Sequence, residues 1–475
     1  MKTMKQKKLI LTMVSAFMIL VSCEVDESLN IDTKNPSSVP SAGLFTEGMR
    51  QFFDQQNSAS VNFNPLRMYA QYWAQTTYPE ESQYTQVTRN HGRNIWREMY
   101  KDALKDLTGA RDIVIANEEN DADNKVACIG VLEVAAYAHL VEIFGDVPYT
   151  DALDSSNPSP KYDDAETIYL DLFTKLDAAI SAMDTSGSGF AAAQDPVFGG
   201  DMSLWKIAAN SLKLRMAMRI ADSNPGVSKT MAENAATGVI MSAAENFSIT
   251  YEATAPNTHP VWRTLVESGR DDFVAANTLV DAMNDLNDPR RDFYFELHEG
   301  AYSGGIYGSA NASSGFSALS DELKDPALPG NFITVAEVRF LLAEAAARGY
   351  SVPGDAPTHY ALGVTESIME WGGDQSMVDA YLANPDVAWA TATGNDMQKI
   401  AMQKWIAMFN NGMEAWTTIR LFDYPILNEI ETGEQMPTRF LYPQDEPQLN
   451  NASYEAGAAA IGGDTKTTKL FFDVN

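Results

Sequence analysis

Residues Asp396–Pro425 read DMQKIAMQKWIAMFNNGMEAWTTIRLFDYP and carry the clearest helical pattern in the chain. Apolar residues recur there at steps of three and four, at Met397, Ile400, Ala401, Trp405, Met408, Phe409, Trp416 and Ile419. This spacing predicts a long core helix of an all-α protein. Asp396 is placed to cap it and Tyr424-Pro425 to end it, because the residue before proline avoids helical angles. Gly412 costs about 1 kcal/mol inside a helix relative to alanine, so we expect another segment to pack closely over it.

The first 22 residues have the composition of a signal peptide. Four lysines precede Leu9–Val21, a mainly apolar run that is shorter than the ~20 residues a transmembrane helix needs. The run ends in Leu20-Val21-Ser22-Cys23, which resembles a bacterial lipobox. We therefore expect Cys23 to become the lipidated N-terminus after cleavage, with plain secretory cleavage near Ser22 as the alternative.

Residues 23–41 are expected to form a lipidated tether. Glu24-Val25-Asp26-Glu27 resembles the acidic export signal that sends Bacteroidetes lipoproteins to the outer face of the outer membrane. Asn30–Ser41 contains two prolines and no hydrophobic period, which is typical of a linker. No internal linker follows, so residues 42–475 are predicted to form a single domain.

Composition excludes several other classes of protein. The formal net charge of −30 disfavours nucleic-acid binding, which needs basic patches. No second run of 18 or more apolar residues follows the signal peptide. The second of the two cysteines, Cys128, lies among apolar residues and is expected to be a buried thiol.

Further helices are predicted by the same periodicity. They cover Trp96–Asn117, Val126–Phe144, Tyr162–Met183, Trp205–Ala221, Ile333–Tyr350 and Tyr360–Trp371. Helices of this length joined by short turns suggest stacked pairs like tetratricopeptide repeats, although no strict 34-residue repeat can be read.

Two loop regions are candidates for binding. Around Trp73 the helical period gives way to a polar loop that carries Tyr78 and Tyr84 beside amide and carboxylate side chains. Flat aromatic faces beside such groups suit sugar rings, but the same tyrosines could equally pack into the core. Residues 246–330 are rich in glycine and serine and carry Trp262, Tyr302 and Tyr307; long irregular stretches of this kind are often functional.

Several blocks of the chain resemble the SusD/RagB family of nutrient-binding outer-membrane lipoproteins. Besides Asp396–Pro425, they are FGDVPY at 144–149, DPVFGGDMSLWKIAANSLKLRMAMRIAD at 195–222, DPR at 288–290, ITVAEVRFLLAEAAARGY at 333–350 and PTRFLYPQDEPQLNNASY at 437–454. The resemblance implies a mainly α RagB/SusD-like fold, in which tetratricopeptide-like helical pairs form the scaffold and long irregular loops carry the ligand site.

The resemblance also implies a function. Such proteins capture a glycan or peptide at the cell surface without cleaving it and pass it to a SusC-like TonB-dependent transporter in the outer membrane. The ligand site is then expected between two walls, one with Trp73, Tyr78 and Tyr84 and the other with Trp262, Tyr302 and Tyr307. No cofactor or metal is implied.

A surface-anchored glycoside hydrolase is the alternative. Such enzymes need two opposed carboxylates about 5–9.5 Å apart in a cleft, and a chain this acidic could supply them. Glu337 and Glu344 lie two turns apart in a predicted helix, but in the family they are scaffold residues. No catalytic motif is present, and the five histidines are too scattered to suggest a metal cluster.

Overall fold

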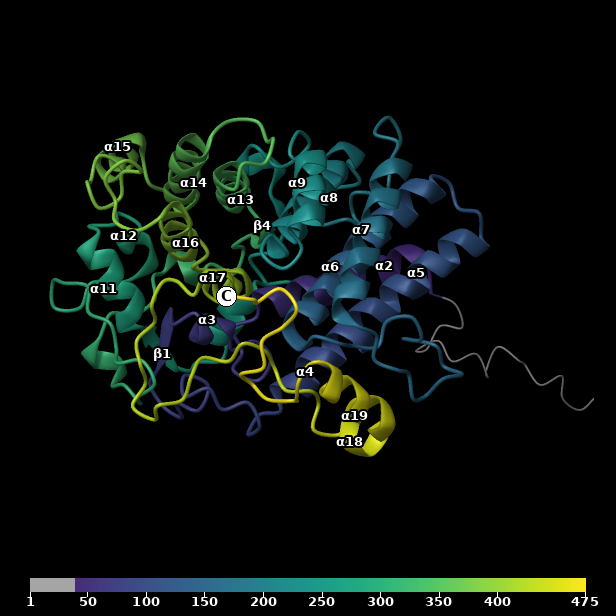
Figure 1. Cartoon of the computed structure of the whole chain (residues 1–475), viewed down its shortest axis with the longest axis horizontal. Coiled ribbons are helices and arrows are strands. Elements are labelled where there is room, and N and C mark those ends of the chain that lie inside the picture. The colour runs from purple at the N-terminus through teal and green to yellow at the C-terminus, as the bar shows by residue number, and fades with distance from the viewer. Residues whose placement is uncertain (1–38) are drawn as a thin grey trace, which may run out of the picture. The chain divides into compact units, whose positions relative to one another are not determined.

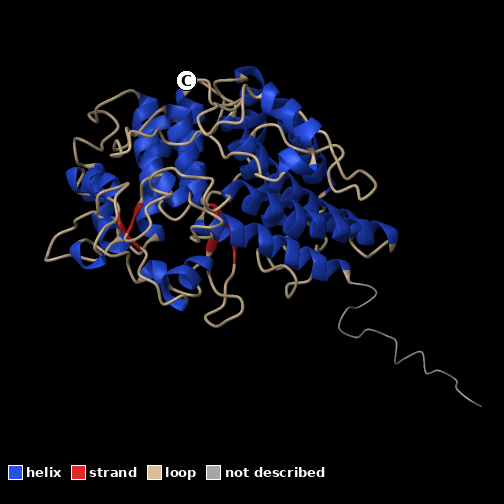
Figure 2. Cartoon of the chain, turned by 90° about the horizontal axis from the view of Figure 1, so that it is seen from below, coloured by secondary structure: helices blue, strands red, loops and turns tan. Residues whose placement is uncertain are grey.

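The structure, a computed structural model, describes residues 39–475 and is mainly α-helical, as predicted (Figures 1 and 2). The predicted signal peptide, Cys23 and nearly all of the predicted tether lie outside the described residues. The described helices of the first half are α2 (Ser41–Asn57), α3 (Leu66–Tyr69), α4 (His91–Arg97), the π-helical η2 (Glu98–Leu104), α5 (Lys105–Ala116), α6 (Ala122–Phe144), α7 (Ala165–Ala182), α8 (Met202–Arg219), α9 (Pro225–Ala235) and the 3-10 turn η3 (Ala243–Glu245).

The second half mixes short and long helices. They are α10 (Pro260–Trp262), η4 (Arg263–Glu267), α11 (Asn277–Asp285), α12 (Arg291–Tyr294), η5 (Ser313–Gly315), η6 (Glu322–Lys324), α13 (Val335–Ala347), α14 (Ala356–Glu370), α15 (Gln375–Leu382), α16 (Asp396–Ala407), α17 (Gly412–Phe422), α18 (Glu446–Leu449) and α19 (Asn451–Ala460). Consecutive helices pack against each other as α6 with α7, α8 with α9, α13 with α14 and α16 with α17. Pairing of consecutive helices was predicted from the sequence, whereas α9 was not predicted and α16 with α17 was predicted as one helix.

Within residues 39–475, four short strands form two antiparallel ribbons. β1 (Trp73–Gln75) pairs with β3 (Phe273–Ala275), and β2 (Phe247–Ile249) pairs with β4 (Gly330–Ile333). The first ribbon places Trp73 opposite Ala275 and Gln75 opposite Phe273. It therefore joins the aromatic region near residue 73 to the glycine-rich region of residues 246–330.

The predicted long helix at Asp396–Pro425 is two helices, α16 and α17. Asn395, one residue earlier than expected, caps α16 and forms a capping box with Gln398. Asn411 caps α17, because its side chain accepts a hydrogen bond from the Glu414 backbone N–H at 3.2 Å. The expected close approach at Gly412 is confirmed, since a Cβ there would lie 2.6 Å from the backbone nitrogen of Arg67.

A network of buried ion pairs links the helices of the core. Arg215 on α8 makes two hydrogen bonds to Glu337 on α13, of 2.7 and 2.6 Å. Arg219, one turn later, lies 2.6 Å from Glu414 on α17 and 3.2 Å from Glu142 on α6. Burial alone would raise the pKa of Glu414, but the surrounding Arg215, Arg219 and Lys404 lower it to about 2. Glu414 is therefore ionised at neutral pH and holds three helices through its cationic partners.

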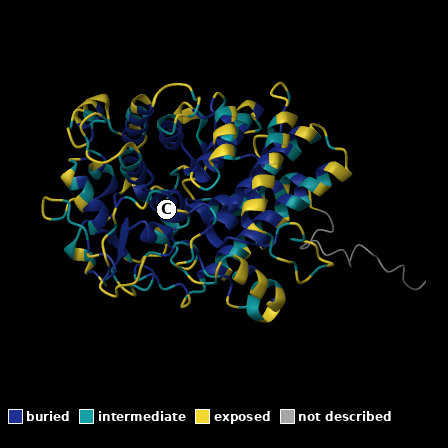
Figure 3. Ribbon diagram, in the orientation of Figure 1, coloured by how far each residue is buried: buried dark blue, intermediate teal, exposed yellow. Residues whose placement is uncertain are grey.

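Buried residues concentrate in the interior of the helical layers (Figure 3). α6 is long and apolar enough to cross a membrane by length and composition, and 78% of its most apolar window is buried inside the protein. It carries Cys128, whose thiol is free and buried as predicted. The helix serves here as the centre of the scaffold, packed against α5, α7 and α8.

Candidate functional site

Three loops converge on β1 and α3, and we call residues 76–90, 300–311 and 424–434 together the loop assembly. Asn311 donates its backbone N–H to the Gln75 carbonyl at 3.0 Å, and the Gln83 side chain donates to the Gly308 carbonyl at 2.9 Å. A Cβ at Gly308 would lie 2.8 Å from the side chain of Ile430, so the third loop packs directly on the second. Figure 1 shows β1, α3 and the yellow-green C-terminal segment in the same part of the molecule.

The side chain of Gln71 connects two of these loops through hydrogen bonds. Its buried amide donates to the Tyr84 hydroxyl at 2.8 Å and to the Asn428 carbonyl at 2.9 Å. Its carbonyl oxygen accepts from the Thr278 hydroxyl at 2.5 Å and from the Asn428 N–H at 3.1 Å. One fully buried side chain thus uses all four of its hydrogen-bonding positions to connect α3, two loops and α11.

The loop of residues 76–90 is held by its own buried polar groups. The Gln75 amide donates to the Tyr78 carbonyl at 2.9 Å and to Glu81 at 2.7 Å, and it accepts from Ser82. Burial raises the pKa of Glu81, while Gln75 and Arg89 lower it in part. Since these groups are satisfied inside the loop, the loop keeps a defined conformation that presents Tyr78.

Three of the six predicted ligand-binding aromatics lie in the core. The exposed fractions of Trp73, Tyr84 and Tyr307 are 1%, 2% and 3%. Tyr84 and Tyr307 pack with ring centroids 6.0 Å apart, and the Tyr307 hydroxyl donates to the Met68 carbonyl at 2.6 Å. Ligand stacking needs an open ring face, and in these three residues the face is covered; they join the two predicted walls to each other.

The other three predicted aromatics keep solvent-accessible surface. Tyr78 is 64% exposed, and Trp262 and Tyr302 are half-buried. The Tyr302 hydroxyl donates to Asp292 at 2.7 Å, and Arg291 lies 5.6 Å from its ring centroid. Burial and Asp292 raise the pKa of Tyr302, so its hydroxyl stays protonated at neutral pH. Tyr78 and Tyr302 are held by different elements: the Tyr78 carbonyl accepts from Gln75 at 2.9 Å, and the Tyr302 carbonyl accepts from Asn284 at 3.1 Å.

Three exposed aliphatic residues of the loop assembly were not found by sequence reasoning. Val87 is 54% exposed, Ile306 is 59% exposed and Ile426 is 78% exposed. An isolated isoleucine between Gly305 and Tyr307 was a visible signal, since an apolar residue in a glycine-rich turn has no helical or strand pattern to explain it. With Tyr78 they place exposed apolar side chains on all three loops of the assembly.

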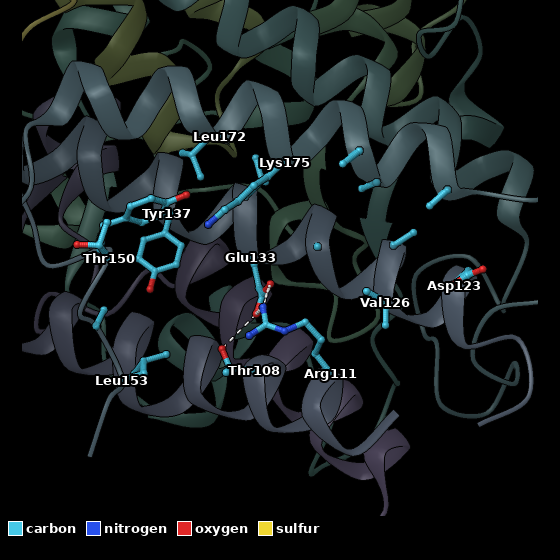
Figure 4. A pocket seen from close by; sticks show the side chains of 18 residues that line it. Thr108, Arg111, Asp123, Val126, Glu133, Tyr137, Thr150, Leu153, Leu172 and Lys175 are labelled. Carbon is cyan, nitrogen blue, oxygen red and sulfur yellow. Dashed lines mark hydrogen bonds and ion pairs between the residues drawn. The ribbon is translucent and has the colours of Figure 1, made fainter. Parts of the chain in front are cut away.

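A separate cavity of about 520 Å3 lies between α5, α6 and α7, away from the loop assembly (Figure 4).

Among residues 39–475, no group of three or more His, Cys, Asp or Glu side chains is arranged to hold a metal ion. Glu337 and Glu344 are both buried, and Glu344 accepts from Arg348 at 2.8 Å. Both carboxylates lie in the scaffold with arginine partners.

Comparison with known proteins identifies the family. A family model described as "Starch-binding associating with outer membrane" matches residues 33–443. The chain belongs to the SusD-like family. A search of curated proteins finds no match for this SusD-like chain.

Solved structures share the SusD-like fold over nearly the whole chain. One described as a chitin-binding protein is 27% identical, with a TM-score of 0.79, over 92% of this chain and 100% of its own. A chitin-binding SusD homologue from Flavobacterium johnsoniae is 25% identical, with a TM-score of 0.79, over 92% of this chain and 99% of its own. A SusD homologue from Bacteroides uniformis is 24% identical, with a TM-score of 0.80, over 91% and 99% of the two chains.

Replacing Gln71 by alanine should loosen the loop assembly of this SusD-like protein. Tyr84, Thr278 and Asn428 would each lose a buried partner, so we expect the free energy of unfolding to fall by about 1–3 kcal/mol. Amide hydrogen exchange in residues 424–434 should become faster. Gln444→Ala is the matched control, because Gln444 is exposed and makes a single hydrogen bond to the Val87 carbonyl. Equal stability and exchange in the two variants would show that Gln71 does not hold the loops.

Proposed function

We propose that the protein is a non-catalytic cell-surface binding protein that captures a glycan and delivers it to a SusC-like TonB-dependent transporter. The observation that carries this proposal is the family match across residues 33–443, in a family described as starch-binding and associating with the outer membrane. Two similar solved structures, 27% and 25% identical, are described as chitin-binding. A peptide is the other ligand that the resemblance allows.

The loop assembly has the chemistry that a sugar ring requires. A pyranose has an apolar C–H face and a rim of hydroxyl groups, so it binds where an aromatic face adjoins hydrogen-bonding groups. Tyr78 offers an exposed ring, with the polar side chains of Glu80 and Gln83 in the same loop. Tyr302 and Ile306 are further accessible side chains of the loop assembly, and the half-buried Trp262 lies outside it on α10.

The alternative function, a surface-anchored glycoside hydrolase, has less support. A hydrolase needs two carboxylates that face a common cleft. The most conspicuous pair in the sequence, Glu337 and Glu344, is buried and engaged with Arg215 and Arg348. Neither carboxylate is therefore free to protonate a glycosidic oxygen or activate water.

The binding site can be tested with Tyr78→Ala combined with Tyr302→Ala. Each aromatic contact contributes about 0.5–1.5 kcal/mol beyond area burial, so we expect the double variant to bind a glycan ligand about one to two decades more weakly. Isothermal titration with malto- and chito-oligosaccharides measures the change.

The control for this test is Tyr307→Ala, which removes a tyrosine from the core. It should lower the free energy of unfolding by about 3–5 kcal/mol, as for other buried aromatics. The double variant should melt close to the wild type, because Tyr78 is 64% exposed. Undiminished affinity in the double variant would move the ligand site away from these two residues.

The anchor is proposed to be a lipid on Cys23, at the outer face of the outer membrane. Three acyl chains hold a protein firmly, since each buried CH2 contributes about 0.8 kcal/mol. Cys23→Ser should therefore release the protein from the membrane fraction or leave it unprocessed in the inner membrane. Fractionation of cells checks this, and unchanged anchoring at the outer membrane would contradict the lipobox interpretation.

Delivery requires a stable contact with the transporter. We expect the native protein, extracted in mild detergent, to copurify with a TonB-dependent β-barrel. The exposed apolar side chains of Ile306 and Ile426 are suited to such a contact. Migration as a monomer under all extraction conditions, with no barrel in any fraction, would contradict this part of the proposal.

A further inference from the structure

The cavity between α5, α6 and α7 is open to solvent and is lined on several sides by helices and a loop. We call it the helical groove. Its floor is α6, one wall is α5 with Thr108 and Arg111, and the other wall is α7 with Leu172 and Lys175 (Figure 4). The loop carrying Tyr149 and Leu153 closes one end. A volume of about 520 Å3 lies within the ~300–1,000 Å3 typical of small-molecule sites.

Small residues keep the helical groove open. Ala127 and Gly130 on α6 face Ala178, Ala179 and Ala182 on α7. A Cβ at Gly130 would already lie 3.7 Å from the Ala179 Cβ. Ala178 and Ala182 are exposed, so larger side chains there would fill the space without disturbing the core. The groove therefore offers an accessible apolar surface of methyl groups.

The two cations of the groove, Arg111 and Lys175, each have an acidic partner. Arg111 makes two contacts of 2.6 Å with Glu133, and Glu133 also accepts from the Thr108 hydroxyl at 3.1 Å. The Lys175 ammonium lies 3.5 Å from Asp171 and 4.3 Å from the Tyr149 ring centroid. Both cations already have an acidic partner, and Asp123 adds a carboxylate to the lining, so the walls offer no free positive charge to an anionic ligand.

Hydrogen-bonding groups nevertheless face the groove. Tyr137 packs edge to face with Tyr149, with ring centroids 4.8 Å apart, and its hydroxyl has no hydrogen-bond partner within the described part of the chain. The Tyr149 hydroxyl donates to Asp171 at 2.6 Å, which fixes the orientation of the pair. Figure 4 shows Lys175 reaching from α7 toward Tyr137, and the contact between Arg111 and Glu133.

We propose that the helical groove is a second binding site for a neutral sugar ring, separate from the loop assembly. An apolar floor suits the C–H face of the ring, while the Tyr137 hydroxyl, Glu133 and Lys175 can exchange hydrogen bonds with its hydroxyl groups. Internal charge pairing favours a neutral ligand over an acidic one. This inference rests on the proposed glycan-binding function and adds a site to it.

The experiment uses Tyr78→Ala with Tyr302→Ala as background, so that binding at the loop assembly is weakened. Maltohexaose and chitotetraose are titrated into the full-length protein by calorimetry. We expect residual binding, which Ala178→Leu weakens at least tenfold by filling the groove. Tyr137→Phe keeps the ring and removes one hydroxyl, so it should weaken residual binding about 3- to 10-fold. Thr174→Leu is the matched control on an exposed position of α7 outside the groove, and it should change nothing.

Each outcome of this experiment is decisive. The groove site is overturned if Ala178→Leu does not weaken the residual binding. It is also overturned if the double variant shows no residual binding while the wild type still binds. Both results leave the proposed function intact. No binding of either sugar to the wild type counts against glycan binding itself and against the groove with it. If Ala178→Leu instead abolishes copurification with the β-barrel and leaves sugar binding unchanged, the groove is a protein contact and the inference is wrong.

Discussion

The buried carboxylate of Glu414 lies where the scaffold meets the loops. Its charge is balanced by Arg219 at 2.6 Å, Arg215 at 3.5 Å and Lys404 at 3.8 Å, which come from α8 and α16. Removing one partner from a buried pair leaves an uncompensated charge and costs about 3–5 kcal/mol, so the start of α17 has little freedom to move. Two residues earlier, Gly412 lies against the backbone of Leu66 and Arg67, which places α3 and hence Gln71. The loop assembly depends on this chain of contacts.

The scaffold could be predicted from the sequence because its signals are local. Val126–Phe144 has the apolar period of a buried helix, and the structure begins it only four residues earlier, at Ala122. In Asp396–Pro425 the apolar stripe is interrupted at Asn410-Asn411-Gly412, and the structure has two helices there. Apolar residues at helical spacing continue on both sides of the interruption, so periodicity alone does not report the change of direction.

The candidate site could be predicted only in part, because its contacts are distant in sequence. The regions near residues 73–84 and 300–311 were expected to lie together, and they do. The sequence does not predict which tyrosines face solvent. Tyr307 is buried, and its hydroxyl donates to the Met68 carbonyl, 239 residues away. Tyr78 has its backbone carbonyl held by Gln75, and its ring is exposed. Gln71 gave no signal at all, since a buried amide with four partners looks like any surface glutamine in sequence.

The geometry favours recognition over chemistry. The loops are held by buried amides whose hydrogen bonds are satisfied, and their exposed side chains include Tyr78, Ile306 and Ile426. The acidic residues that drew attention in the sequence, Glu337 and Glu344, stabilise helix packing through Arg215 and Arg348. Glu337 and Glu344 therefore form no opposed pair of free carboxylates, and the fixed loops suit the proposed recognition of a sugar.

Binding without cleavage is the central claim, and one measurement tests it directly. The protein is incubated with the oligosaccharide that it binds in titration, at concentrations above the dissociation constant, and the sugar is recovered and analysed by mass spectrometry. The account predicts that the sugar is recovered at its original length however much protein is present. Shorter saccharides that accumulate in proportion to protein concentration would contradict it.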